Sequence, residues 1–104
     1  MASIKLTLKK SDLLEGKPVK VMANGHAVMI VLVGGEIHAI DGVCSHRGGP
    51  LEQGKLEGYN IKCPWHGAIY DIRTGKADPK TPFGKGQAKY NIREGTGGEL
   101  TLEM

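Results

Sequence analysis

The chain has 104 residues, a length that favours a single domain with a modest core. Its net charge of +3 is mild, and no recognition helix or platform of stacking aromatic residues accompanies it, so nucleic-acid binding is not indicated. The longest apolar run, residues 27–33, has the length of a strand, and residues 1–5 lack the apolar stretch of a secretory signal. We therefore expect one soluble, cytoplasmic domain that spans residues 1–104.

The first part of the chain is a series of short apolar segments separated by turns. Alternating or β-branched residues predict strands at 4–9, 18–22, 26–33 and 36–41. Residues 11–16 resemble a capped helical turn that ends at Gly16. The dipeptides Asn24-Gly25 and Gly34-Gly35 predict tight turns, so the strands at 26–33 and 36–41 should form a hairpin.

The second part of the chain repeats this pattern. Further strands are predicted as a pair within 55–62 and at 68–72, 89–93 and 99–102. Residues 73–76 and 95–98 read as turns, and residues 78–86, with two prolines and two glycines, read as a loop. Short strands at regular spacing with glycine-rich turns indicate an all-β fold, an antiparallel β-sandwich or a partly open barrel.

Two clusters of metal-ligating residues interrupt the strands. The first is Cys44-Ser45-His46, followed by Gly48, Gly49 and Pro50, and the second is Cys63-Pro64-Trp65-His66-Gly67. A cysteine and a histidine two residues apart cannot share a helix face, but they can share a face of an extended or turning loop. Two stiff loops at hairpin ends could therefore hold one inorganic unit between them.

Three interpretations compete for these residues. They could be two thiols and two surface histidines without a shared role. They could form a structural zinc site, although zinc sites usually space two cysteines two to four residues apart and two histidines three to five apart. They could instead hold a two-iron, two-sulfide cluster, since histidines replace two cysteines on one iron of a Rieske centre.

The paired motif resembles that of the Rieske iron–sulfur proteins, and it is most similar to the small Rieske-type ferredoxins of bacterial aromatic-ring dioxygenases. Cys-x-His-x-Gly is followed by Cys-x-x-His-Gly, with sixteen residues between His46 and Cys63. The resemblance implies that Cys44 and Cys63 bind the inner iron and that His46 and His66 bind the outer, valence-changing iron. It also implies a small cluster-binding subdomain at one tip of the fold, with cluster-binding loops at about 42–50 and 63–68.

Departures from the wider family bear on disulfide formation and on the redox potential. Respiratory relatives carry a disulfide between the two loops, but the corresponding positions are Gly49 and Trp65, so no such bridge is expected. Those relatives place a serine that bonds a bridging sulfide where this chain has Ala68, whereas a tyrosine that bonds a ligand sulfur is matched by Tyr70. We expect a potential toward the low end of the Rieske range. Tyr70 could equally be an ordinary strand residue.

Other residues of possible function have simpler interpretations. His26 and His38 lie in predicted strands, where we expect strand residues and not ligands. Trp65 could pack its loop or form part of a docking face, and packing is the preferred interpretation. Arg47 could meet an acidic partner or be solvated. Residues 73–93 carry six basic side chains against one acidic, either a solvated face or a docking stripe for acidic redox partners.

The resemblance implies an electron carrier and not an enzyme, with one Rieske [2Fe-2S] cluster per chain. Its partners would be a flavin-dependent reductase, which supplies the electron, and a terminal oxygenase, which receives it. Two alternatives stay open: a small Rieske-like subunit of another oxidoreductase, of the nitrite reductase type, and a zinc-stabilised interaction module.

Overall fold

Two antiparallel sheets make up the structure, a computed structural model that describes residues 3–23, 25–43, 50–65, 67–78 and 87–103. The larger sheet has six strands in the order β1-β9-β8-β4-β3-β2. Their bounds are Ser3–Lys9 (β1), Val19–Ala23 (β2), His26–Val33 (β3), Glu36–Asp41 (β4), Lys89–Glu94 (β8) and Glu99–Glu103 (β9). The smaller sheet has three strands in the order β5-β6-β7, with bounds Lys55–Glu57, Asn60–Lys62 and Ile69–Asp71.

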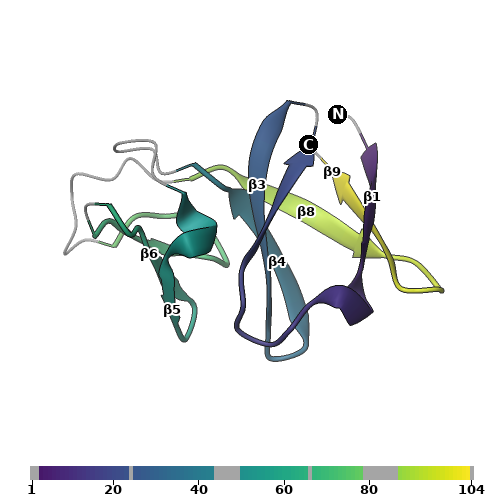
Figure 1. Cartoon of the computed structure of the whole chain (residues 1–104), viewed down its shortest axis with the longest axis horizontal. Helices are drawn as coiled ribbons and strands as arrows, with labels where there is room; N and C mark the ends of the chain where they lie inside the picture. The colour runs from purple at the N-terminus through teal and green to yellow at the C-terminus, as the bar shows by residue number, and fades with distance from the viewer. Residues whose placement is uncertain (1–2, 24, 44–49, 66, 79–86, 104) are drawn as a thin grey trace.

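The larger sheet curls on itself, and the smaller sheet lies at one end of the molecule together with the short helix η2, Leu51–Gln53 (Figure 1). Strands β1 and β2 are the two edges of the curled sheet, so the barrel stays partly open. The predicted all-β fold, a partly open antiparallel barrel with a small subdomain at one tip, is confirmed.

Strands β3 and β4 form a wall between two hydrophobic cores. Along β3, Val28 and Ile30 face the interior of the curled sheet, while Met29 and Val31 face the smaller sheet. A strand that is buried on both faces needs a continuous apolar run, and this explains why residues 27–33 show no alternation. The smaller sheet is therefore held against the back of the central hairpin by a core of its own.

The β3–β4 hairpin agrees residue for residue with the sequence prediction. Its register runs from Val33 opposite Glu36 to Val28 opposite Asp41. Gly34 and Gly35 have φ of 61° and 81°, the left-handed conformation that a two-residue turn of this kind requires at both positions. Its second strand leads the chain directly into the first motif.

The helical turn expected at 11–16 is shorter and begins earlier. It is a 3-10 helix, η1, at Lys10–Asp12, where the Asp12 carboxylate accepts a hydrogen bond of 2.9 Å from the Lys9 backbone N–H. Leu13 has already left the helical conformation, and its side chain is buried in the core of the curled sheet. Burial of Leu13 thus prevails over the local capping signal.

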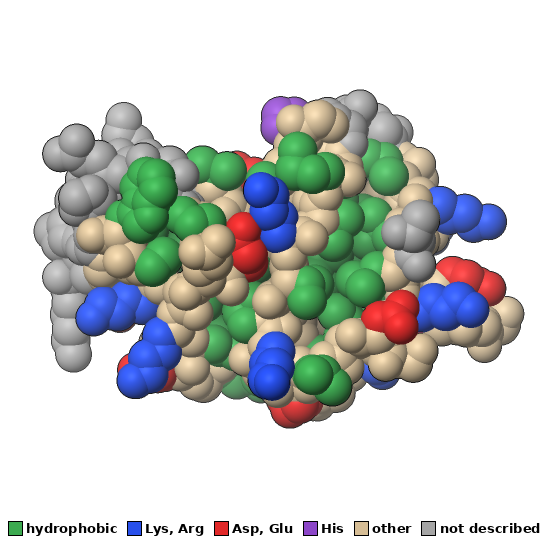
Figure 2. Space-filling model, viewed as in Figure 1, with side chains coloured by type: hydrophobic (Ala, Val, Ile, Leu, Met, Phe, Trp, Pro, Cys, Tyr) green, Lys and Arg blue, Asp and Glu red, His purple; other side chains and the backbone are tan. Residues whose placement is uncertain are grey.

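Apolar side chains gather between the edge strands β1 and β2 on the face shown in Figure 2. Basic and acidic side chains lie beside this patch, near the middle of the view, as well as at the margin. No helix in the described ranges is long and apolar enough to cross a bilayer.

Candidate metal centre

Cys63 is the predicted ligand residue that the structure describes, and it lies in the core beneath the smaller sheet. Only 1% of its surface is exposed. Cys44, His46 and His66 lie outside the described residues, as do Arg47 and the prolines at 79 and 82. The described part of the site therefore consists of Cys63 and the residues that flank each loop.

The second loop closes the β6–β7 hairpin. The backbone N–H of Cys63 donates a hydrogen bond of 2.7 Å to the carbonyl of Ala68, which continues the ladder of the two strands. The N–H of Gly67 then donates to the Cys63 carbonyl at 3.1 Å, and Gly67 has a φ of +76°. A left-handed residue is needed to turn the chain so tightly, and glycine adopts this conformation at low cost.

The first loop is closed at its base by backbone pairing. Val43 and Pro50 form an isolated antiparallel bridge. The Leu51 N–H donates to the Gly42 carbonyl at 3.0 Å, and the Gly42 N–H donates to the Ala27 carbonyl of β3 at 2.9 Å. The chain therefore enters and leaves residues 44–49 at neighbouring points on the central hairpin.

One core cluster brings the two loops together. Leu51, directly after the first loop, is fully buried in the same cluster as Cys63 and Ala68 of the second loop. Gly54, after η2, lies so close to the Lys62 carbonyl that any larger residue would collide with it. A buried cysteine beside two closed loop ends is a setting that fits an iron–sulfur cluster gripped by both loops.

Ala68 and Tyr70 lie on the strand that leaves the second loop, and both are fully buried. Tyr70 pairs with Ile61 in the β6–β7 ladder and belongs to the core cluster of Cys63. Its burial fits both of the roles considered for it, since an aromatic strand residue and a donor to a ligand sulfur would each lie here.

The exposure of Trp65 contradicts the preferred interpretation from the sequence. The residue was expected to pack its loop, but 59% of its surface is exposed. Val43, beside the first loop, is also exposed, at 45%. Two large apolar residues at the loop bases are thus available for contact with another molecule, since surface aromatic residues are enriched where proteins bind one another.

The two histidines outside the motifs are strand residues, as predicted. His26 is exposed at the start of β3, and His38 is buried within β4. The ring of His38 meets that of Tyr59 edge-on, with centroids 5.9 Å apart. Burial lowers the pKa of His38 below its usual value, an effect that nearby Glu36 partly offsets.

Two arginines of the basic segment 73–93 have acidic partners. Arg73 pairs with Asp71, Nη2 to Oδ2 at 2.9 Å, and stacks over the Tyr59 ring at 4.3 Å from its centroid. This hydrogen-bonded arginine also lowers the pKa of Asp71. Arg93 pairs with Glu103 at 3.1 Å. Both arginines thus have acidic partners from outside the segment, and the docking stripe stays a prediction.

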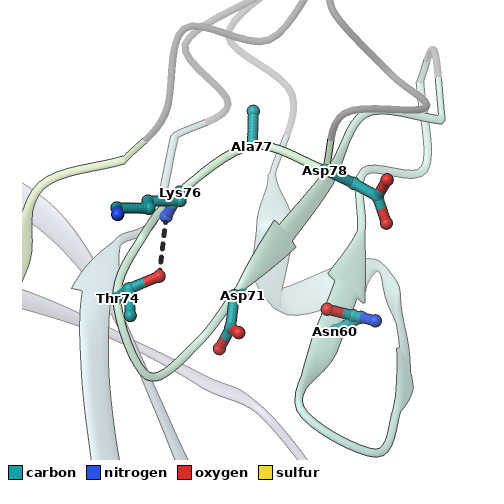
Figure 3. A pocket seen from close by; sticks show the side chains of 6 residues that line it. All are labelled: Asn60, Asp71, Thr74, Lys76, Ala77 and Asp78. Atoms are coloured by element: carbon teal, nitrogen blue, oxygen red, sulfur yellow. Dashed lines mark hydrogen bonds between the residues drawn. The ribbon is translucent and has the colours of Figure 1, made fainter.

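A polar pocket lies beside the strand that leaves the second loop. Its volume is about 350 Å³, and Figure 3 shows its lining of Asn60, Asp71, Thr74, Lys76, Ala77 and Asp78. The Thr74 hydroxyl accepts a hydrogen bond of 3.2 Å from the Lys76 N–H. Pockets for organic ligands are mostly apolar with a few polar groups, whereas Ala77 is the one apolar side chain here, so this pocket suggests no substrate site.

Gln87 is a structural residue that the sequence did not reveal. It is 8% exposed, and its side-chain Nε2 donates to the carbonyls of Asp41, at 2.9 Å, and Val43, at 2.6 Å. Nothing in the local sequence distinguishes this glutamine from a surface residue. Its partners are 46 and 44 positions away, so only the tertiary structure identifies them.

Several known proteins are similar to this chain in sequence and in structure. A family model described as the Rieske [2Fe-2S] domain matches residues 3–91. The ferredoxin component of a p-cumate 2,3-dioxygenase system of Pseudomonas putida is 46% identical over 68 residues, 64% of this chain and 58% of that protein. The ferredoxin component of the naphthalene 1,2-dioxygenase/salicylate 5-hydroxylase systems of Ralstonia sp is 39% identical over 82 residues, 79% of this chain and 78% of that protein.

One solved structure superposes on this chain over almost the entire length of both chains. The ferredoxin of carbazole 1,9a-dioxygenase from Nocardioides aromaticivorans IC177 superposes with a TM-score of 0.87 and 26% identity, covering 96% of this chain and 97% of that one. The buried cysteine and the two closed loops therefore lie in a fold shared with these ferredoxins. The chain belongs to the Rieske [2Fe-2S] domain family, and its cofactor is a [2Fe-2S] cluster of the Rieske type.

Proposed function

We propose that the chain is a one-electron carrier that receives an electron from a flavin-dependent reductase and delivers it to a terminal oxygenase in the cytoplasm. The observation that carries this proposal is the relationship to ferredoxin components of dioxygenase systems over most of the chain. In this proposal residues 1–104 form one domain, with cluster-binding loops at 42–50 and 63–68.

The ligand set that we propose is Cys44, His46, Cys63 and His66. Cysteine thiolates would hold one iron and histidine nitrogens the other, and the bound cluster supplies the one-electron redox chemistry. The core position of Cys63 supports its assignment to the iron that faces the protein interior. Retention of all four ligand residues counts against a nitrite reductase-type small subunit, because such subunits often keep the fold and lose the ligands.

Trp65 and Val43 would form the contact surface for the redox partners. Both are exposed, and each lies within a cluster-binding loop, so a partner that covers them would approach the cluster closely. Tryptophan is among the residues that contribute most to binding energy at protein interfaces. The partner's surface at this point should therefore be apolar.

Single-turnover electron transfer tests the proposal. The holoprotein, reduced chemically under anaerobic conditions, is mixed with the oxidised terminal oxygenases of p-cumate and naphthalene dioxygenase systems. We expect one electron per chain to reach at least one oxygenase, seen as bleaching of its visible absorption. Reoxidation no faster than in buffer alone with both oxygenases would contradict the proposed partner class.

A matched pair of variants tests the contact surface in the same experiment. Trp65→Ala should lower the second-order rate at least about tenfold, as expected for loss of an aromatic anchor. Met22→Ala removes an equally exposed apolar side chain, 61% against 59%, from β2 of the other sheet and should leave the rate unchanged. Equal effects of the two substitutions would exclude a specific role for Trp65.

A further inference from the structure

We propose that Gln87 is a positioning residue for the cluster: it fixes the backbone that enters the first cluster-binding loop and ties it to the turn that follows the second. This inference rests on the proposed ligand set, because its consequence is the placement of Cys44. It assigns a role to a residue outside both motifs.

The side chain of Gln87 binds the backbone that enters the first loop. One amide nitrogen donates to two carbonyls, those of Asp41 and Val43, on either side of Gly42. An amide group has two N–H bonds, so both donors of this nitrogen are used. The second of these carbonyls belongs to the residue immediately before Cys44.

Backbone hydrogen bonds also hold the residues on both sides of these carbonyls. The Asp41 N–H donates to the Ala88 carbonyl at 2.8 Å, and Gly42 is bound through both its N–H and its carbonyl. Val43 pairs with Pro50 across the loop base. Gln87 adds two side-chain hydrogen bonds to this pairing, at the carbonyls on either side of Gly42. Its amide therefore completes a rigid platform for the residue that follows.

The main chain of Gln87 contacts the turn after β7. Its N–H donates to the Gly75 carbonyl at 2.6 Å, and its own carbonyl lies so close to Gly75 that a Cβ there would collide with it. Gly75 belongs to the turn after β7, the strand that leaves the second loop. One residue thus bridges the entry of the first loop and the turn after β7, the strand that follows the second loop.

The chemistry of the pairing explains why a glutamine is needed. Buried carbonyls that lose a donor are costly, and a donor that reaches two carbonyls two positions apart must be a planar amide or a similar fork. Methionine has almost the same length and no donor. Glutamate has the same shape, and it can donate one hydrogen bond only when its carboxyl group is protonated.

The experiment measures cluster retention and local exchange in the holoprotein. Iron release to a chelator is followed through the loss of visible absorption, and amide hydrogen exchange is followed by mass spectrometry. We expect Gln87→Met to release iron about tenfold faster and to raise exchange in peptides that cover 40–52 by a similar factor, the size expected when a local opening loses one or two hydrogen bonds. The EPR lines of the reduced form should broaden as the loop samples more than one arrangement.

Gln53→Met is the matched control, because Gln53 is an exposed glutamine in η2 on the same side of the fold. It should behave as the wild type in all three measurements. Exchange in the β1 and β9 peptides should stay unchanged in Gln87→Met. If these distant strands exchange faster to the same degree, or if iron release is unchanged, Gln87 has no positioning role.

Gln87→Glu provides a second test that does not depend on the methionine variant. Its iron release relative to wild type should be fast at pH 8 and approach the wild-type rate at pH 5, as protonation restores one donor. The same ratio at both pH values would overturn the proposal. If neither variant accumulates as holoprotein, exchange in the wild type decides, since the amides of Gly42 and Leu51 must then be as slow as those of β3.

Failure of this inference is distinguishable from failure of the proposed function. A wild-type protein without iron and labile sulfide would remove the ligand set itself. An iron-loaded wild type whose Gln87 variants match it in all measurements would remove only the role of Gln87.

Discussion

Ala68 and Ala39 are two fully or almost fully buried alanines in different cores. Ala68 lies beside Cys63 in the core of the smaller sheet, and Ala39 lies inside the curled sheet. By its resemblance to respiratory Rieske proteins, the position of Ala68 is one where a hydroxyl could bond a bridging sulfide. The two residues therefore form a matched pair for the effect of a single added hydroxyl group.

Ala68→Ser should raise the midpoint potential, because a donor to sulfur stabilises the additional negative charge of the reduced cluster. A hydrogen bond to a charged group is worth about 1.5–3 kcal/mol, so the ceiling is roughly 60–130 mV for one electron. Sulfur is a weak acceptor and only the difference between redox states counts, so we expect a few tens of millivolts by voltammetry. Ala39→Ser should leave the potential unchanged; an unchanged or lower potential in Ala68→Ser would refute this account of the position.

His38 should make the protein less stable in mild acid. Its pKa is lowered by burial, with smaller contributions from Lys89 and Arg73 that lower it and from Glu36 and Asp71 that raise it. Among the described residues, its Nε2 has no hydrogen-bond partner. The unfolded chain therefore binds a proton more readily than the folded one, and stability falls as the pH falls below about 6.5, the ordinary histidine pKa.

His38→Phe keeps a ring against Tyr59 and removes the titration. The apparent midpoint of thermal unfolding should therefore depend less on pH between 7.5 and 5 in this variant than in the wild type. His26→Phe, the same substitution at an exposed strand position, should keep the wild-type dependence. A His38→Phe curve parallel to that of the wild type would show that His38 does not carry the effect.

At the scale of elements, the turn after β7 is held by its approach to the segment before β8. Gly75 has a φ of +79° and no room for a Cβ against the Gln87 carbonyl, whereas Gly98, in the β8–β9 turn, has a φ of +84° and open space around it. The two glycines share the same conformation and differ in their surroundings. A comparison of the two therefore separates backbone strain from steric contact.

Gly98→Ala should cost about 1–2 kcal/mol, the penalty for a left-handed alanine. That cost corresponds to a decrease in the midpoint of thermal unfolding of very roughly 4–16 °C. Gly75→Ala should lower the midpoint at least about twice as far, because the turn must also move away from Gln87. Equal decreases in the two variants, measured by differential scanning calorimetry, would mean that moving the Gly75 turn away from Gln87 costs no stability.

The elements that were predicted well are those whose signal is local. The β3–β4 hairpin is encoded in its turn glycines and its apolar run, and the strands at 55–57 and 60–62 follow from the same kind of signal. The helical turn at 11–16 was misplaced because burial of Leu13, a tertiary effect, decides where the chain leaves the helical conformation. The 3-10 helix η2 has no such local signal and was not predicted.

At the scale of the molecule, motif spacing predicted the chemistry while the supporting structure depended on distant contacts. The pairing of β1 with β9 joins the two ends of the chain, from Ser3 opposite Glu103. The side-chain hydrogen bonds of Gln87 likewise connect segments far apart in sequence, as do the contacts of the Tyr59 ring with His38 and Arg73. The exposure of Trp65 also depends on how the loop lies against the core, which apolar character alone does not determine.

At this scale, the arrangement of the two sheets also explains how the fold serves an electron carrier. The curled sheet supplies a rigid base. One face of the central β3–β4 hairpin packs in the core of the curled sheet, and the other face packs against the smaller sheet. The two loop bases therefore rest on one continuous element. A site that changes redox state with little rearrangement needs such a support, because its ligands must stay in place while the charge changes.

Iron and labile-sulfide content, combined with EPR of the reduced form, tests the central claim most directly. We predict that protein purified and reconstituted without oxygen contains two irons and two labile sulfides per chain, as one [2Fe-2S] cluster requires. Its average g value should lie below that of all-thiolate clusters, as mixed imidazole and thiolate ligation implies. A folded protein that contains zinc or no iron, or a spectrum of the all-thiolate type, would contradict the account.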